Sequence, residues 1–92
     1  MITVYVIRSV SNGKRYVGIT NDLSRRLLEH KSNQTAAGHL LGAFDLLWTE
    51  EFQDHLQARV REKELKSGQG RKWLDEKFGR PPDASLGMSR PA

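Results

Sequence analysis

Residues 2–20, ITVYVIRSVSNGKRYVGIT, contain two stretches rich in β-branched and aromatic residues on either side of a turn sequence. Such residues pack well on a pleated surface and favour strands over residues 2–8 and 15–20. Between them, Ser11-Asn12-Gly13 supplies residue types that accept the backbone conformations of tight turns. The sequence therefore predicts an antiparallel β-hairpin at the start of the chain.

An amphipathic helix is expected directly after this hairpin. Asn21 and Asp22 are residue types that cap helix N-termini, and leucine recurs four and five residues after Leu23. This spacing predicts a helix that reaches about Lys31, with an apolar stripe on one face and basic residues on the others.

A third strand is expected in the middle of the chain. Residues 43–52, AFDLLWTEEF, start apolar and end acidic, and we expect this strand to join the hairpin. The preceding residues 32–42 mix turn formers with small residues, and a short helix is expected around residues 35–41.

Helices are expected in the last part of the chain. After Asp54, the segment HLQARVREKELKS has good helix formers throughout, and Gly68 is the expected C-terminal cap. Residues 70–78 predict a shorter helix, and residues 79–92, which hold all three prolines, predict a flexible tail. The predicted fold is α+β, a three-stranded antiparallel sheet flanked by helices in α/β/α layers, within a domain at residues 1–78.

The composition limits the class of protein. The chain has 92 residues, which suffice for one domain with a modest core, and it has no cysteine, which excludes disulfides and thiolate metal sites. Its apolar stretches are much shorter than the roughly 20 residues that cross a bilayer, so a cytoplasmic protein without membrane contact is expected. Fifteen Lys and Arg against eleven Asp and Glu give a net charge of +4, which favours a polyanionic partner such as nucleic acid.

Two tyrosines stand on the two arms of the predicted hairpin. Tyr5 lies in VYVI and Tyr16 in YVGIT. Taken separately, each is typical of a strand tyrosine that packs its ring and leaves its hydroxyl at the surface. Gly18 adds to their interest, because glycine within a strand marks close approach by another group.

Charged residues on the two predicted helices are further candidates. Arg26 and His30 are four residues apart and share a helix face, where a guanidinium can bind a phosphate and an imidazole can relay a proton. Glu62 shares a stripe with Ala58 and Leu65, and a single carboxylate can ligate Mg²⁺ or Mn²⁺. The alternatives are a solvated basic face for the first pair and an ion pair between Glu62 and Lys66 four residues later for the carboxylate.

Together these features resemble the GIY-YIG nucleases. The similarity rests on the pairing of VYV with YVG, the arginine ten residues after Tyr16, the stretch YVGITNDLSRRLLEHK, and the AxxxExxLK run from Ala58 to Lys66. It covers about residues 2–74 and is closest to the compact single-domain members. The chain is also similar to the N-terminal nuclease domain of the bacterial excision-repair endonuclease and to the catalytic domains of homing endonucleases.

The resemblance implies a role for each candidate. It matches Tyr5 and Tyr16 to the two motif tyrosines, Arg26 to the arginine that contacts the scissile phosphate, and Glu62 to the ligand of one Mg²⁺ or Mn²⁺ ion. His30 matches a histidine common among the compact members. In the implied mechanism a tyrosine activates water; Tyr16 is the preferred base, and Tyr5 remains open as the other choice.

The chain also departs from the family pattern. Thr3 and Val4 stand where the family name has glycine and isoleucine. No clear counterpart exists of the asparagine that many members carry near the end of the domain, for which Gln69 is a candidate replacement. With little room for a separate recognition domain, weak sequence selectivity on duplex or branched DNA is expected.

Basic residues near the candidates are expected to contact DNA. A non-catalytic nucleic-acid-binding module of the same fold, and a small interaction protein with an acidic protein partner, are the competing hypotheses. Trp73 is expected to anchor the last helix, with base stacking as the alternative. The residues expected to bind nucleic acid are Lys14, Arg15, Arg25, Lys31, Lys66, Arg71 and Lys72.

Overall fold

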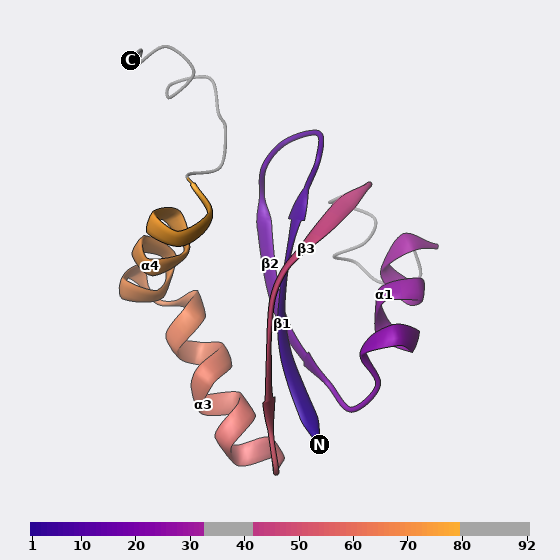
Figure 1. Cartoon of the computed structure of the whole chain (residues 1–92), viewed down its shortest axis with the longest axis vertical. Coiled ribbons are helices and arrows are strands. Elements are labelled where there is room, and N and C mark those ends of the chain that lie inside the picture. The colour runs from indigo at the N-terminus through magenta and orange to yellow at the C-terminus, as the bar shows by residue number, and fades with distance from the viewer. Residues whose placement is uncertain (33–41, 80–92) are drawn as a thin grey trace.

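The computed structural model describes residues 1–32 and 42–79. Within these ranges a sheet lies between helices on its two faces, as Figure 1 shows. The α+β fold and the three-stranded antiparallel sheet are confirmed. The elements are β1 (Ile2–Ser9), β2 (Arg15–Thr20), α1 (Leu23–Lys31), β3 (Phe44–Phe52), α3 (His55–Lys66) and α4 (Gly68–Phe78).

The sheet is built around β1. The strand order is β2-β1-β3, and β1 pairs antiparallel with both neighbours. The predicted hairpin forms with Gly13 at a φ of 75°, a conformation that glycine adopts without a Cβ clash. In its register Tyr5 lies opposite Gly18 and Ile7 lies opposite Tyr16. The two edges of the sheet are therefore β2, which follows the hairpin turn, and β3.

The alternation of side chains along β1 divides the core into two clusters. Tyr5 and Ile7 point to the α1 side, where Leu23 and Leu27 pack against them. Val4 and Val6 belong to the cluster on the other side, formed with buried side chains of α3 and α4. Because successive strand residues face opposite ways, this one strand supplies both layers of contact. The buried residues on the α3 and α4 side that join this cluster are Ala58, Leu65 and Leu74.

Two of the helix starts follow directly from the sequence. The Asp22 side chain accepts a hydrogen bond from the Arg25 backbone N–H at 3.1 Å and caps α1. The Asp54 side chain does the same for Gln57 at 2.9 Å and caps α3. Each bond satisfies a backbone donor that the first helical turn leaves without a partner.

The junction between α3 and α4 differs from the prediction. Gly68 is not the cap of α3; Ser67 is, and Gly68 is instead the first residue of α4. Ser67 serves both helices, because its backbone N–H bonds to carbonyls of α3 while its hydroxyl accepts from the Gly70 N–H. A Cβ on Gly70 would lie 2.0 Å from the Glu64 carbonyl oxygen. Glycine at position 70 thus lets α4 begin against the end of α3.

Some predictions lie outside the described residues. The short helix expected around residues 35–41 lies outside the described ranges. The expected tail at 79–92 also lies outside them, except for Gly79. Among the described helices, none has the length and apolar character needed to span a membrane.

Candidate active site

Tyr5 and His30 form the buried centre of the site. Both are completely buried, and the Tyr5 hydroxyl lies 2.8 Å from Nε2 of His30. Tyr5 comes from the middle of β1, and His30 comes from the last turn of α1, which packs over the same face. The ring of His30 also meets the ring of Phe44 edge-on at a centroid distance of 6.1 Å. This packing fixes the imidazole and the phenol relative to each other.

Burial sets the protonation of both groups. It raises the pKa of Tyr5 to about 12, and the neighbouring Arg26 guanidinium, which favours the phenolate, only partly offsets this effect. Burial also lowers the pKa of His30 below its ordinary 6.5, and the positive charge of Arg26 adds to the shift. At neutral pH the pair therefore consists of a neutral phenol and a neutral imidazole.

Arg26 lies beside this pair and reaches the surface. Its side chain is 35% exposed, and Nη1 lies 3.0 Å from Oε1 of Glu29. Hydrogen bonding with the Tyr5 hydroxyl, followed by that with Glu29, raises the pKa of the guanidinium above its ordinary value. Arg26 is thus a permanent cation between the buried phenol and the solvent. The expected proximity of Arg26 and His30 is present in the structure, with Tyr5 near both.

Tyr16 is the more accessible of the two tyrosines. Its side chain is half-buried. Its ring centroid lies 6.1 Å from that of Tyr5 and 5.4 Å from that of His30. Gly18 makes this arrangement possible, because a Cβ there would lie 2.6 Å from the Tyr5 hydroxyl and 2.8 Å from Tyr16 Cε2. Tyr16 also lines a cavity of about 420 Å³.

Glu62 lies on α3, the helix on the other face of the sheet from α1. Its side chain is only 15% exposed; Oε2 lies 2.9 Å from Nζ of Lys66, and Oε1 lies 3.8 Å from Nε of Arg59. The ion pair considered as an alternative is therefore formed. Glu62 stands on the side of α3 that carries the buried residues Ala58 and Leu65, as the sequence predicted.

The donor set suits a hard divalent cation with few protein ligands. Within residues 1–32 and 42–79, no group of three or more His, Cys, Asp or Glu side chains is placed to hold a metal. Mg²⁺ and Mn²⁺ accept a single carboxylate, with water and substrate oxygens filling the remaining positions. Glu62 fits such an ion once the Lys66 ammonium moves aside, whereas a zinc site of several protein ligands does not fit these residues.

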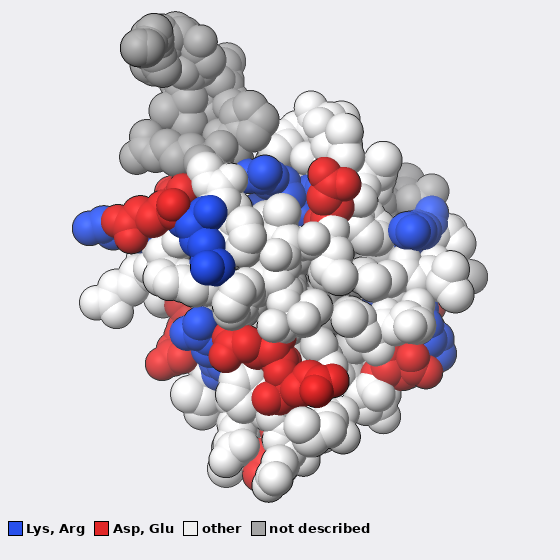
Figure 2. All heavy atoms as spheres, in the orientation of Figure 1, with Lys and Arg blue, Asp and Glu red and all other residues white. Residues whose placement is uncertain are grey.

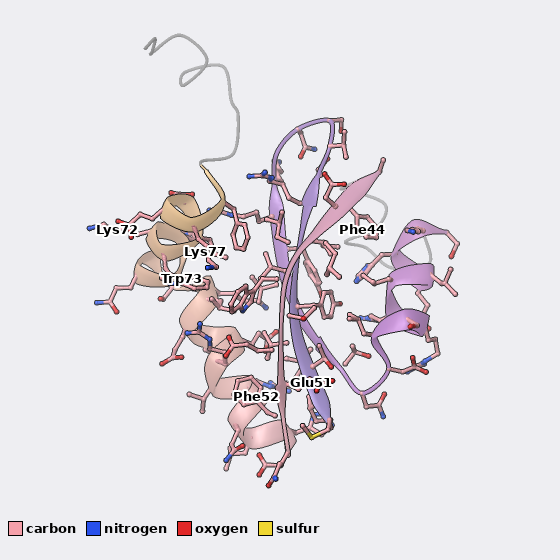
Figure 3. All side chains as sticks on the ribbon, in the orientation of Figure 1. Phe44, Glu51, Phe52, Lys72, Trp73 and Lys77 are labelled. Carbon is pink, nitrogen blue, oxygen red and sulfur yellow. The ribbon has the colours of Figure 1, made fainter. Side chains whose placement is uncertain are left out.

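The basic residues expected to bind nucleic acid divide into two groups. Four of them, Lys14, Arg15, Lys66 and Arg71, line the cavity beside Tyr16. Arg25 and Lys31 lie on α1, and Lys72 points away from the sheet on α4, as Figure 3 shows. The face seen in Figure 2 carries acidic and basic side chains side by side. The basic charge is thus concentrated in places and does not cover the molecule evenly.

Comparison with known proteins found one matching family and one similar structure. A family model described as the GIY-YIG catalytic domain matches residues 1–74. The chain belongs to the GIY-YIG family. The solution NMR structure of the UPF0213 protein BH0048 from Bacillus halodurans is similar to it, with 28% sequence identity and a TM-score of 0.51. That match covers 99% of this chain and 100% of the other. The curated proteins gave no match.

The departures of this GIY-YIG domain from the motif in the family name concern packing positions. Val4 is fully buried in the cluster on the α3 side, and Thr3 is 8% exposed. The candidate side chains themselves come from β1, β2, α1 and α3. Gln69 is not placed with them, because it lines a separate cavity with Arg61 and Trp73.

Two residues near the GIY-YIG site were missed by sequence reasoning. Glu29 pairs with Arg26, and its position three residues later on the same helix was a readable signal. Asp75 pairs with Arg15 at 2.7 Å, a contact between α4 and β2 that no local pattern indicates. Trp73 packs as expected, with its ring 5.3 Å from that of Trp48 and turned toward the sheet in Figure 3.

Proposed function

We propose that this protein is a divalent-metal-dependent endonuclease that hydrolyses phosphodiester bonds in DNA. The observation that carries the proposal is the grouping of Tyr5, Tyr16, Arg26 and His30 on one face of the sheet, with Tyr16 and Arg26 accessible from outside. Family membership supports a nuclease-type fold, and the residue roles below are our assignment.

Arg26 is assigned to the scissile phosphate. Hydrolysis develops negative charge on the phosphoryl oxygens, and a fixed guanidinium stabilises that charge with paired N–H donors. In the free protein Glu29 occupies Nη1, so Arg26 is held in place before substrate arrives. The scissile phosphodiester carries one negative charge, as the partly exposed Glu29 carboxylate does, and it is expected to compete with Glu29 for the guanidinium.

Tyr16 is assigned as the group that takes a proton from the attacking water. Tyr5 is unsuited to this role, because it is completely buried, its hydroxyl is bonded to His30, and its pKa is raised to about 12. Tyr16 is half-buried and lines an open cavity, so water reaches it. We assign Tyr5 and His30 the task of orienting Tyr16 and Arg26 from beneath.

Glu62 is assigned as the protein ligand of one Mg²⁺ or Mn²⁺ ion. When bound, the ion supplies Lewis-acid stabilisation of the leaving 3′ oxygen. The carboxylate is mostly shielded from solvent, and in the free protein Lys66 and Arg59 neutralise its charge.

A cleavage screen tests the proposal. Wild-type protein and the Tyr16→Phe variant are incubated with duplex, flap, fork and single-stranded DNA in Mg²⁺ or Mn²⁺. We expect wild-type protein to nick or cut at least one substrate and Tyr16→Phe to lose that activity. Salt-sensitive DNA binding without cleavage of any substrate would instead assign the protein as a binding module. Failure to bind DNA or RNA at low salt would favour an acidic protein partner.

A further inference from the structure

The cavity beside Tyr16 has the chemistry of a nucleotide site. It has a volume of about 420 Å³, within the range of about 300–1,000 Å³ for small-molecule sites. Val17 of β2, Leu65 of α3 and Leu74 of α4 give it an apolar lining. Tyr16 and the cations Lys14, Arg15, Lys66 and Arg71 complete it. An anion attached to an apolar or aromatic body suits such a lining better than a bare anion does.

Arg15 contributes a guanidinium group with one buried nitrogen that no described residue pairs with. Its side chain is 9% exposed, and Nη2 lies 2.7 Å from Oδ1 of Asp75. That contact is an ionic one with poor hydrogen-bond alignment, since Oδ1 has no well-formed hydrogen bond despite the short distance. Nη1 is buried, and no acceptor among the described residues pairs with it. Buried donors are nearly always paired, so an unpaired one in a residue that lines a cavity indicates a missing acceptor.

Asp75 makes this donor rigid. It holds the guanidinium from α4 while the Arg15 backbone belongs to β2. On the neighbouring strand Arg8 donates from Nη1 to the carbonyl oxygens of Phe78 and Gly79, at 3.2 and 3.3 Å, and so fixes the end of α4. Both contacts hold α4 against the hairpin, and residues of β2 and α4 line the cavity.

From these observations we propose that the cavity is a subsite for one nucleotide of the substrate next to the cleaved bond. The phosphate group contacts the guanidinium groups of Arg15 and Arg71, and the sugar or nucleobase lies on the apolar lining. Tyr16 belongs to both the cavity and the proposed catalytic group, which places this nucleotide beside the reaction. The nucleotide must leave the base stack to enter, as in enzymes that extrude a base. That the nucleotide belongs to a DNA substrate rests on the proposed function, whereas the position of the subsite rests on the cavity.

Methyl NMR on metal-free protein tests the subsite directly. The methyl resonances of Val17, Leu65 and Leu74 are followed during titration with a deoxynucleoside 5′-monophosphate, the matching nucleoside, and inorganic phosphate. We expect the monophosphate to shift all three residues and to bind at least about tenfold more tightly than either fragment. Equal binding of phosphate and monophosphate, or no shift at millimolar monophosphate, would overturn the proposal.

A matched pair of variants separates the subsite from general charge. Arg71→Gln removes a cation that lines the cavity, whereas Lys63→Gln removes an exposed cation of α3 that does not line it. We expect about tenfold weaker monophosphate binding in Arg71→Gln, because one charged hydrogen bond is lost, and unchanged binding in Lys63→Gln. Equal losses in both variants would contradict a defined site. Both side chains are exposed, so thermal unfolding is expected to show that both variants fold.

Two further measurements identify the source of the nucleotide and keep this proposal apart from the proposed function. A DNA oligonucleotide is expected to displace the monophosphate; an oligonucleotide that binds without displacing it would assign the cavity to free nucleotides and overturn the subsite. Arg26→Ala is expected to lose cleavage but retain monophosphate binding. If wild-type protein binds the monophosphate but cuts no DNA, the proposed nuclease function is refuted and the nucleotide site is not. If it cuts DNA but does not bind the monophosphate, the proposed subsite is refuted and the nuclease function is not.

Discussion

The Tyr5 hydroxyl and Nε2 of His30 lie 2.8 Å apart, and both side chains are fully shielded from solvent. This hydrogen bond joins the central strand to the last turn of α1. The bond therefore serves the fold, and we propose different tasks for the two tyrosines. In this proposal Tyr5, which is fully buried, supports the site from inside the protein, and Tyr16, which is half-buried, meets the solvent.

Exchange of each tyrosine for phenylalanine separates these tasks. Tyr5→Phe removes the partner of a buried imidazole nitrogen and is expected to lower the free energy of unfolding by about 1–3 kcal/mol. Tyr16→Phe removes a half-exposed hydroxyl and is expected to change stability by less than about 0.5 kcal/mol while reducing cleavage at least about 100-fold. Chemical denaturation and cleavage assays check both. Stability losses in the reverse order would contradict the division of tasks.

His30 is expected to make stability depend on pH. Its pKa is lowered by burial, so the folded state resists protonation more than the unfolded state does. The contribution is fully present above the ordinary value of 6.5 and is lost as the pH falls from there toward the folded pKa. Unfolding free energies measured at about pH 7.5 and about pH 5 should therefore fall more for wild-type protein than for His30→Gln.

Gly18 provides a test of the packing between the tyrosines. In Gly18→Ala the new methyl group meets the Tyr5 hydroxyl and the Tyr16 ring at distances well below contact, so the rings must shift. We expect a loss of about 1–3 kcal/mol in stability together with loss of cleavage. Gly68→Ala is the control, because its Cβ meets nothing within 4 Å, and it should leave stability unchanged or slightly raised. Normal cleavage by folded Gly18→Ala would show that tyrosine placement is not critical.

The adjacent arginines of α1 are expected to have different effects, Arg26 on the cleavage rate and Arg25 on DNA binding. Arg26 lies beside Tyr5, whereas the Arg25 side chain is 58% exposed and pairs loosely with Asp22 and Glu29 at 3.6 Å. Arg26→Ala should lower the single-turnover cleavage rate on saturating DNA by about 100-fold to 1,000-fold. Arg25→Ala should weaken DNA binding and its salt dependence but keep that rate. Equal rates in the two variants would remove Arg26 from the scissile phosphate.

Much of the fold was predictable because its signals are local. The hairpin followed from β-branched strands around Gly13, and α1 followed from Asp22 and the leucine stripe. The boundary between α3 and α4 was not predicted correctly. Gly68 has the composition of a helix end, but the capping bonds of Ser67 and the close approach at Gly70 decide where α4 begins. Those contacts depend on two helices meeting and leave no mark on local propensity.

The candidate site also has features that the sequence predicted and features that depend on tertiary contacts. Spacing within α1 placed Arg26 and His30 together, and the stripe on α3 placed Glu62 on the buried side. The sequence left open which tyrosine meets water, because that choice depends on how deeply α1 buries Tyr5. The pairing of Arg15 with Asp75 joins segments sixty residues apart, and only the folded arrangement of β2 and α4 brings them together.

The most direct test of the nuclease assignment compares two glutamates of α3. Glu62 is nearly shielded from solvent, and Glu64, two residues later, has a side chain that is 60% exposed. DNA cleavage is measured for wild-type protein, Glu62→Gln and Glu64→Gln over a range of Mg²⁺ and Mn²⁺ concentrations, with thermal unfolding to show that each protein is folded. A metal ligand at Glu62 predicts that Glu62→Gln loses cleavage at every metal concentration while Glu64→Gln cuts like wild-type protein. Undiminished cleavage by folded Glu62→Gln would contradict the account.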